Sequence, residues 1–330
     1  MSVCQPLKRT RSPSPQLTAP ASKRSRLERS TVATNFLIIS DTHDAELTMP
    51  KCDVLLHCGD LTEDGSPASL KTTLKALGKA DAELKLVIAG NHDISLDESY
   101  YLSEGGWKKD HMEACALVSS QEDSEASKNG IVFLEEGTHT FTLQSEATFR
   151  IYASPYTPQY GASAFQYPSE EDRFNDATST PKWSKNVSTE KSTIPENIDI
   201  VMTHGPPKYL LDATADGRSP GCEHLRRAIA RTQPRLHCFG HIHRGYGAQR
   251  IEYDNMKTPA DDPDCINVLP KEWVGKNQAK RKGYACLPPN SADEFRKSKA
   301  QTLVVNAAIM DEDNEPGNAP WMVELELPVD

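Results

Sequence analysis

Five short apolar runs, each rich in Val, Ile or Leu, recur along the chain. They cover residues 35–40, 53–58, 84–89, 198–202 and 236–239. Runs of this length without polar alternation are typical of strands that are buried on both faces. The pattern therefore predicts five buried strands.

Two segments between these runs have helical periodicity. Residues 66–80 begin with Ser66 as a cap candidate and Pro67 at the first helical position, and leucines follow at helical spacing. Residues 222–235 repeat the pattern and reach a stop at Pro234. Strands that alternate with helices indicate an α/β fold with a partly parallel sheet.

Other apolar runs have fewer helices between them. These runs are IVFLEE, TFTLQ, FRIYAS, TLVVNAA and WMVELEL. We expect them to form a second, mainly antiparallel sheet that packs against the first. Residues 155–195 and 252–300 are polar, contain proline and lack clear periodicity, so we predict insertions or long loops at the surface.

The first 33 residues differ from the rest in composition. They are rich in Ser, Pro and basic residues and have almost no core-forming side chains, which predicts a disordered tail at 1–33 before a single domain at 34–330. Seven Lys or Arg against Glu28 give the tail a charge of +6. Its KRTR and SKRSR clusters are either a nuclear-localisation signal, which an import receptor would bind, or solvated basic residues that no partner binds.

Charge and cysteine usage narrow the class of protein. The chain has a formal net charge of −10, and subtracting +6 for the tail leaves −16 for the folded part, which disfavours a nucleic-acid polymer as its partner. Small anionic substrates remain possible if bound cations reverse the local field. No apolar run approaches the roughly 20 residues that cross a bilayer, and no secretory signal is present. Eight cysteines without a CxxC pair fit reduced thiols in the cytosol or nucleus.

Each of the five predicted strands runs directly into side chains that bind metals or transfer protons. In open α/β sheets, ligands gather in the crevice at the carboxyl ends of the strands. Singly, these residues have ordinary explanations as turns or hydrogen-bonded histidines, whereas their shared order behind five strands favours one site. They are Asp41 and His43, then Asp60, then Asn91, His92 and Asp93, then His204, and finally His241 and His243.

The order DxH, GD, GNHD, H and GHxH resembles the signature of the calcineurin-like metallophosphoesterase superfamily. The stretches HCGDLTEDG, THGPPK and GCEHLRRAIARTQPRLHCFGHIHRGYG are similar to the metallophosphoesterase-domain-containing proteins of animals and their fungal relatives. The resemblance covers about residues 34–247. It implies a metallophosphoesterase-type β-sandwich of two mixed sheets flanked by helices (α/β/β/α).

The resemblance also implies a dinuclear centre of two divalent metal ions. The first ion would be held by Asp41, His43 and His243, the second by Asn91, His204 and His241, and Asp60 would bridge the two. Mixed nitrogen and oxygen donors suit Mn, Fe or Zn, and the spacing does not select among them. Cys58 is a further candidate ligand, although its alternation on the strand favours core packing.

Two more residues take roles from the resemblance. His92 would face the substrate and stabilise the transition state or protonate the leaving oxygen, and Asp93 would orient its ring. Arg244 and Lys208 are close in sequence to predicted ligands, so they would either bind a second negative charge of the phosphate or lie solvated.

Two metal ions about 3.5 to 4 Å apart can share a hydroxide that attacks phosphorus in line. We therefore predict a metal-dependent phosphoesterase, and specifically a phosphodiesterase for small substrates such as cyclic nucleotides. A phosphomonoesterase or protein phosphatase would use the same metals. A further alternative is a metal- or nucleotide-binding interaction protein with vestigial catalysis, but the presence of every expected ligand favours an enzyme.

Overall fold

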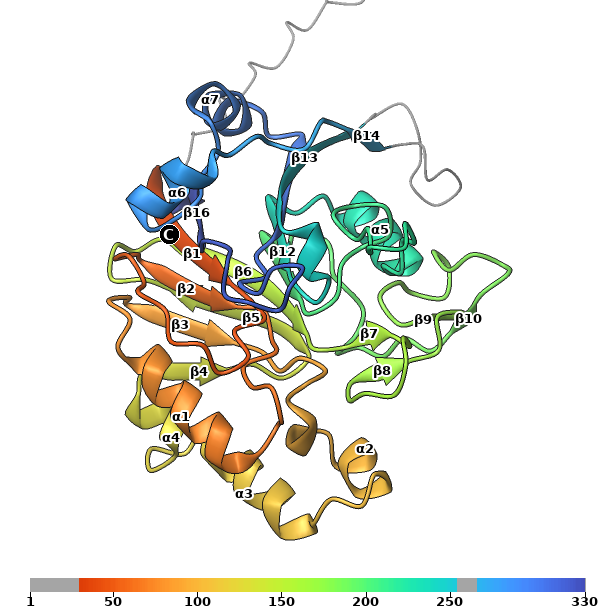
Figure 1. Cartoon of the computed structure of the whole chain (residues 1–330). Helices are drawn as coiled ribbons and strands as arrows, with labels where there is room; N and C mark the ends of the chain where they lie inside the picture. Colours follow the sequence, from red (N-terminus) through yellow and green to blue (C-terminus); the bar gives the residue numbers. More distant parts are fainter. Residues whose placement is uncertain (1–29, 254–265, 330) are drawn as a thin grey trace, which may run out of the picture.

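Two β-sheets pack face to face at the centre of the molecule, which the computed structural model describes for residues 30–253 and 266–329 (Figure 1). In the first sheet β1 to β4 run parallel, and β16 pairs antiparallel with β1. Its strands, in spatial order, are β16 (Trp321–Pro328), β1 (Thr31–Ile39), β2 (Val54–His57), β3 (Leu84–Val87) and β4 (Ile131–Phe133).

The second sheet is mixed. Its central strands β6, β11, β12 and β15 run parallel, while β5, β13 and β14 pair antiparallel with their neighbours at its two sides. The spatial order is β14 (Ile266–Val268), β13 (Gly247–Tyr253), β15 (Gln301–Asn306), β12 (Leu236–Phe239), β11 (Ile200–Thr203), β6 (Thr148–Ser154) and β5 (Gly137–Thr142).

Alternate side chains on each strand face different layers. In β1, Phe36 and Ile38 point into the core between the sheets, whereas Leu37 and Ile39 point to the outer face. The ring of Phe36 meets that of Phe149 from the second sheet edge-on at 5.4 Å. Burial of apolar surface at this interface is the main force that holds the sandwich together.

Helices cover both outer faces (Figure 1). On the first sheet lie α1 (Pro67–Gly78), α3 (Lys108–Val118) and α4 (Glu125–Lys128), and α5 (Glu223–Thr232) lies on the second. As the sequence predicts, Ser66 caps α1 by accepting a hydrogen bond from the Ser69 amide at 3.2 Å. The layers are therefore α/β/β/α, which confirms the predicted fold class.

The distribution of strands between the sheets differs from the sequence-based expectation. The strand ends of β1, β2 and β3 belong to one sheet, but β11 and β12 belong to the other. The runs IVFLEE and WMVELEL form β4 and β16 of the first sheet. The central strands of the second sheet are parallel, so the prediction that this sheet is mainly antiparallel is wrong. Strand pairing depends on contacts between residues far apart in sequence, which local patterns do not encode.

Several segments predicted as tail or loop have regular structure. β1 begins at Thr31, so the last three residues of the predicted tail pair with β16, while the tail's residues 1–29 lie outside the described residues. The 252–300 segment contains β14, α6 (Lys276–Lys282) and α7 (Pro289–Lys297) rather than loops alone. A helix follows β3 as well, namely α2 (Glu98–Ser103) after the short 3-10 turn η1 (Ile94–Leu96).

The 155–195 segment is mostly irregular, as predicted, with two pairs of two-residue strands. Phe174 and Ile194 from this segment are fully buried against the second sheet. The pairs are β7 (Thr157–Pro158) with β8 (Gln166–Tyr167), and β9 (Glu171–Asp172) with β10 (Lys185–Asn186).

Within the two described ranges, every helix is too short or too polar to cross a lipid bilayer.

Candidate metal centre

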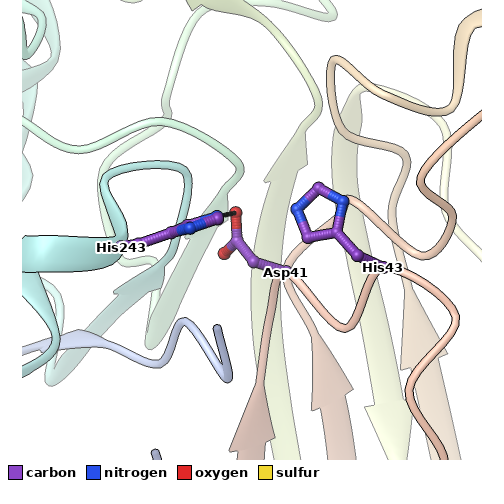
Figure 2. Close-up of side chains that lie close together, drawn as sticks. All are labelled: Asp41, His43 and His243. Carbon is purple, nitrogen blue, oxygen red and sulfur yellow. Dashed lines mark ion pairs between the residues drawn. The ribbon is translucent and has the colours of Figure 1, made fainter. Parts of the chain in front are cut away.

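The loops that follow five strand ends, three from the first sheet and two from the second, meet at one edge of the sandwich. There the ligand-type atoms of six predicted residues form two groups, each with its atoms within 4.8 Å of one another. Figure 2 shows the first group, in which Asp41 at the end of β1 lies between two imidazole rings. The groups are Asp41, His43 and His243, and Asp60, His204 and His241.

Asp60 lies between the two groups. Its Oδ2 is 3.7 Å from His43 Nε2 and 3.3 Å from His204 Nε2. Its Oδ1 accepts a hydrogen bond from the backbone amide of His92 at 2.8 Å, which fixes the carboxylate plane. One carboxylate therefore faces a histidine of each group, as a residue that bridges two cations must.

Three of the histidines share one arrangement. In each, Nδ1 faces an oxygen outside the centre: the Glu63 carboxylate at 2.8 Å for His43, the Cys58 carbonyl at 2.9 Å for His204, and Asn314 Oδ1 at 3.1 Å for His243. Because these oxygens accept hydrogen bonds, they favour the tautomer with the proton on Nδ1. The lone pair of Nε2 is then directed into the centre, as in metal-binding histidines.

The backbone at the centre is strained in a way that points to function. Four predicted ligands have left-handed φ angles, namely Asp41 at 51°, His43 at 41°, Asp60 at 52° and His241 at 65°. Non-glycine residues in this region cost on the order of 1–3 kcal/mol each and gather at functional sites. The left-handed backbone conformation turns each side chain away from its strand and towards the shared centre.

Two glycines permit the close approach of these loops. A Cβ on Gly240 would lie 1.9 Å from Asp41 Oδ2, and one on Gly90 would lie 2.3 Å from the backbone nitrogen of Asp60. The amide of His241, next to Gly240, donates to both carboxylate oxygens of Asp41 at 2.9 Å. Gly240 of GHIH thus lets the last motif touch Asp41 of the first, and Gly90 of GNHD lets the third motif touch Asp60 of the second.

Asn91 lies beside the second group. Its Oδ1 is 2.9 Å from His204 Nε2, and its Nδ2 donates to the Ser163 hydroxyl at 3.1 Å. The carbonyl oxygen is therefore directed at the centre, consistent with a neutral ligand that adds no negative charge.

His92 lies at the same edge, with its ring 4.7 Å from that of His43. The predicted contact with Asp93 is absent, because the Nδ1 atom of His92 donates instead to the Glu63 carbonyl at 3.0 Å. Asp93 is buried and accepts from the Gly90 amide at 2.8 Å and from the amide and hydroxyl of Thr62 at 3.1 and 2.8 Å. It therefore joins two motif loops and does not orient the His92 ring.

Burial and charge shift the protonation equilibria in opposite directions. Burial lowers the pKa of His241 to about 4. Burial also disfavours protonation of His204, but the charge of Asp60 outweighs it and raises the pKa of His204 to about 9. For Asp93, burial and then the charge of Asp60 raise the pKa to about 6. The centre thus concentrates negative charge that a cation would neutralise.

Sequence reasoning missed two residues that contact the ligands. Glu63 forms a further group of ligand atoms with His43 and His92, and its place three residues after Asp60 in CGDLTEDG was the available signal. Asn314 lies in an irregular loop with no motif, so no signal pointed to its contact with His243. Cys58 is fully buried in the core between the sheets, which confirms packing over metal binding.

The donor set fits divalent cations. It combines imidazole nitrogens with carboxylate and amide oxygens and includes no thiolate. The Nε2 atom of His43 is buried and makes no hydrogen bond, so this nitrogen is left with unused binding capacity. Unpaired buried polar atoms cost free energy, and a bound metal is an ordinary way to satisfy them.

Comparison with known proteins agrees with this geometry. The family model of the calcineurin-like phosphoesterases matches residues 34–245. The chain is 34% identical over 246 residues to Metallophosphoesterase domain-containing protein 1 of Homo sapiens, which covers 72% of this chain and 68% of that protein. It is 34% identical over 218 residues to a protein named probable rhamnogalacturonate lyase C from Emericella nidulans, covering 66% of this chain but only 18% of that protein.

A distant likeness to a solved structure accompanies these matches. Purple acid phosphatase PPD1 from yellow lupin aligns over 91% of this chain and 47% of its own, with 12% identity and a TM-score of 0.39. The family match covers more than half of the chain and contains all seven predicted metal ligands. The chain therefore belongs to the calcineurin-like phosphoesterase family, and it is a metallophosphoesterase, a hydrolase that acts on phosphoester bonds.

Proposed function

We propose that the protein is a two-metal phosphodiesterase that hydrolyses small phosphodiesters such as cyclic nucleotides. The observation that carries this proposal is the position of Asp60, whose Oδ2 faces His43 at 3.7 Å and His204 at 3.3 Å. A single carboxylate shared by two groups of ligands is what a pair of neighbouring cations requires.

The ligand assignment follows the two groups. Manganese, iron and zinc all suit this donor set. When bound, such cations lower the pKa of a coordinated water and neutralise charge on the phosphoryl group. The residues that would hold the ions are Asp41, His43 and His243 for one, Asn91, His204 and His241 for the other, and Asp60 for both.

His92 supplies the proton for the leaving group in this proposal. Its Nδ1–H is held by the Glu63 carbonyl at 3.0 Å, which leaves Nε2 as its free nitrogen. When protonated, Nε2 can donate to the oxygen that departs from phosphorus. The amide of His92 also holds Asp60 at 2.8 Å, so the acid and the bridging carboxylate keep a fixed separation.

Glu63 favours diesters over monoesters. Its side chain is 68% exposed, and its carboxylate lies 2.8 Å from His43 Nδ1. A monoester carries more negative charge than a diester near neutral pH, so this carboxylate repels it more strongly.

Rates on two aryl phosphates would test the proposal directly. With added manganese, the full chain is expected to hydrolyse bis(4-nitrophenyl) phosphate faster than 4-nitrophenyl phosphate, and chelation should abolish both activities. Asp60→Asn should remove the activity, whereas Asp81→Asn, at a residue 73% exposed beside Lys51, should not. Full activity in the Asp60 variant would contradict the proposal, and faster monoester hydrolysis would replace the diesterase with a phosphomonoesterase.

We further propose that the protein acts in the cytosol or nucleus and that an import receptor binds its basic tail. All six cysteines in the described residues are free, which fits a reducing compartment. Because Thr31 already pairs in β1, the informative truncation removes residues 1–29 only. Nuclear accumulation of a fluorescent protein fused to residues 1–29 would support the proposal, and its absence would oppose it.

A further inference from the structure

A cavity of about 370 Å³ lies beside the metal centre and is not used by the ligands. One wall is Arg244 and Gly245, which directly follow His243 in the 3-10 turn η2 (His243–Gly245). Another wall is the loop after His204, which contributes Tyr209 and Leu211. The cavity is thus flanked by two of the loops that carry predicted metal ligands.

The walls of this cavity are fixed by backbone contacts. Asn306 Nδ2 donates to the carbonyl of Leu211 at 3.2 Å and to that of Ile242 at 2.9 Å, which joins the two loops. Their approach is so close that a Cβ on Gly245 would lie 1.9 Å from the Leu211 oxygen. A pocket whose walls are preformed loses little entropy when a ligand enters.

Two cationic residues, Lys271 and Arg244, line the cavity. Lys271 lies across Gly247 with its Nζ 3.5 Å from the Gly245 carbonyl, and it has no carboxylate partner among the described residues. Arg244 is 46% exposed and reaches Glu312 only at 3.7 Å. Lys208 and Arg226 lie near the ring of Tyr209, at 5.3 and 5.8 Å from its centroid.

Negative charge is nearly absent from the same walls. Among the described residues that line the cavity, only Asp212 carries a carboxylate. Asp212 is 2% exposed, and its Oδ2 accepts the amide of Gly221 at 3.0 Å, so this oxygen faces the backbone. A positive cavity in a chain of net charge −10 is a local reversal that suits an anion.

We propose that this cavity binds a second anionic group of the substrate, a phosphate or carboxylate, through Lys271 and Arg244. The proposal rests on the proposed phosphoesterase function and names a feature of its substrate. A cyclic nucleotide has no such group, so diesters that carry one are preferred over it. Tyr209, 60% exposed, offers a planar surface for the part of the substrate between the two anions.

The two ends of the site have opposite charge. The ring of His43 lies 4.7 Å from that of His92 and 5.4 Å from that of His243. Glu63 is beside His43 and His92, whereas Arg244 follows His243. A substrate with a second anion is therefore oriented, because its extra charge is repelled at the Glu63 end and attracted at the Arg244 end.

A pair of chromogenic diesters tests the subsite in the manganese-loaded full chain. The first is the 4-nitrophenyl ester of thymidine 5′-phosphate, and the second carries an additional 3′-phosphate or 3′-carboxymethyl group. Each partly exposed cation is expected to contribute about a factor of three, so the added anion should lower KM by about tenfold. Lys271→Met should reduce the advantage to about threefold, and Lys271→Met with Arg244→Gln should remove it.

Lys276→Met, at an exposed residue of α6, is the matched control and should keep the full advantage. An advantage in either arm supports the subsite and shows which anion it accepts. Equal KM values for all the diesters, or an advantage that survives in the double variant, would overturn it.

Binding separates this proposal from the proposed function. Calorimetry should show thymidine 3′,5′-bisphosphate binding about tenfold more tightly than thymidine 5′-phosphate, with the difference lost in the double variant. If no diester is hydrolysed but this difference appears, the subsite stands and the proposed phosphodiesterase activity fails. If both ligands bind equally, the subsite fails whatever the turnover.

Discussion

Two buried clusters of Asp and His in the described part of the chain differ, because the first has features of a reactive site and the second does not. The first is the metal centre around Asp60 and His204. The second lies between the 155–195 segment and α5, where His224 Nε2 is 2.9 Å from Ser184 Oγ and His224 Nδ1 is 3.5 Å from Asp172 Oδ2. Its residue types and order match those of a nucleophilic triad.

The carboxylates of the two clusters differ in what they already bind. Asp172 accepts hydrogen bonds from the amides of Phe174 and Asn175 at 3.1 Å, from Asn175 Nδ2 at 3.1 Å and from the Thr180 hydroxyl at 2.9 Å. The Ser184 hydroxyl donates to the Glu170 carbonyl at 2.5 Å and is unavailable for transfer to His224.

Asp60, by contrast, keeps Oδ2 free to face two imidazole nitrogens. The same contrast appears in the histidines, since burial lowers the pKa of His224 although Asp172 lies beside it. In His204, the charge of Asp60 outweighs burial and raises the pKa to about 9. A carboxylate with unused lone pairs and a strained backbone marks the functional cluster, whereas a saturated one marks a structural cluster.

Substitution of one histidine in each cluster should show the largest difference between the metal centre and the second cluster. His204→Gln removes a predicted metal ligand and should lower phosphodiester kcat/KM more than about a hundredfold. His224→Gln, at an equally buried residue, should leave kcat/KM of the folded protein within about twofold. Steady-state kinetics on both variants decide, and a comparable loss in His224→Gln would place that cluster in the active site.

Removal of the Asp172 carboxylate should show its structural role. Asp172→Ala leaves buried donors from three residues without an acceptor and should reduce the free energy of unfolding by about 2–3 kcal/mol. Asp176→Ala, at an exposed residue of the same segment, should cost much less. Urea denaturation measures both, and equal losses would refute the special role of the buried residue.

Loss of the Glu63 carboxylate tests whether this residue positions His43 as a metal ligand. Glu63→Gln weakens the interaction that holds His43 Nδ1, so affinity for manganese should fall about tenfold. The ratio of monoester to diester turnover should rise at the same time, because a repulsive charge is removed. Calorimetric titration with manganese gives the affinity, with Asp64→Asn as the neighbouring control; unchanged values would mean that His43 is positioned by its own loop.

The smallest effect is expected at Ser184. Ser184→Ala removes hydrogen bonds to Glu170 and His224 and should cost about 1 kcal/mol of stability. Hydrolysis of a neutral aryl ester should be the same in the parent and the variant, because the proton of Ser184 is already engaged. A selective loss of esterase activity in the variant would show that the second cluster is catalytic.

The sequence predicts the functional cluster far better than the structural one. Ligands in the metal centre follow strands whose buried character is visible in apolar runs, and β12 lies at the predicted residues 236–239. Asp172 and His224 meet through an irregular segment with no such pattern. Their contact depends on the folded path of that segment, which local periodicity does not carry.

Other features could not be predicted from the sequence, also for physical reasons. α7 buries only Phe295 and α6 only Ala279, so neither helix has the repeated apolar spacing that signals helical structure. The predicted role of Asp93 came from the family resemblance, but its side chain turns to the loop of Thr62. Adjacent residues in a tight turn commonly face different neighbours, and sequence distance does not resolve which.

The predicted ligands are divided between the two sheets, with Asp41, Asp60 and Asn91 following strands of one and His204 and His241 following strands of the other. Asp41 and His241 are 200 positions apart in the chain. A cation coordinated by Asp41 and by His243, two residues beyond His241, would act as a cross-link that closes this long loop, so its binding energy adds to folding stability. Newly made chains that fold under metal starvation would therefore lack this cross-link between the two sheets at the edge where the metal centre lies.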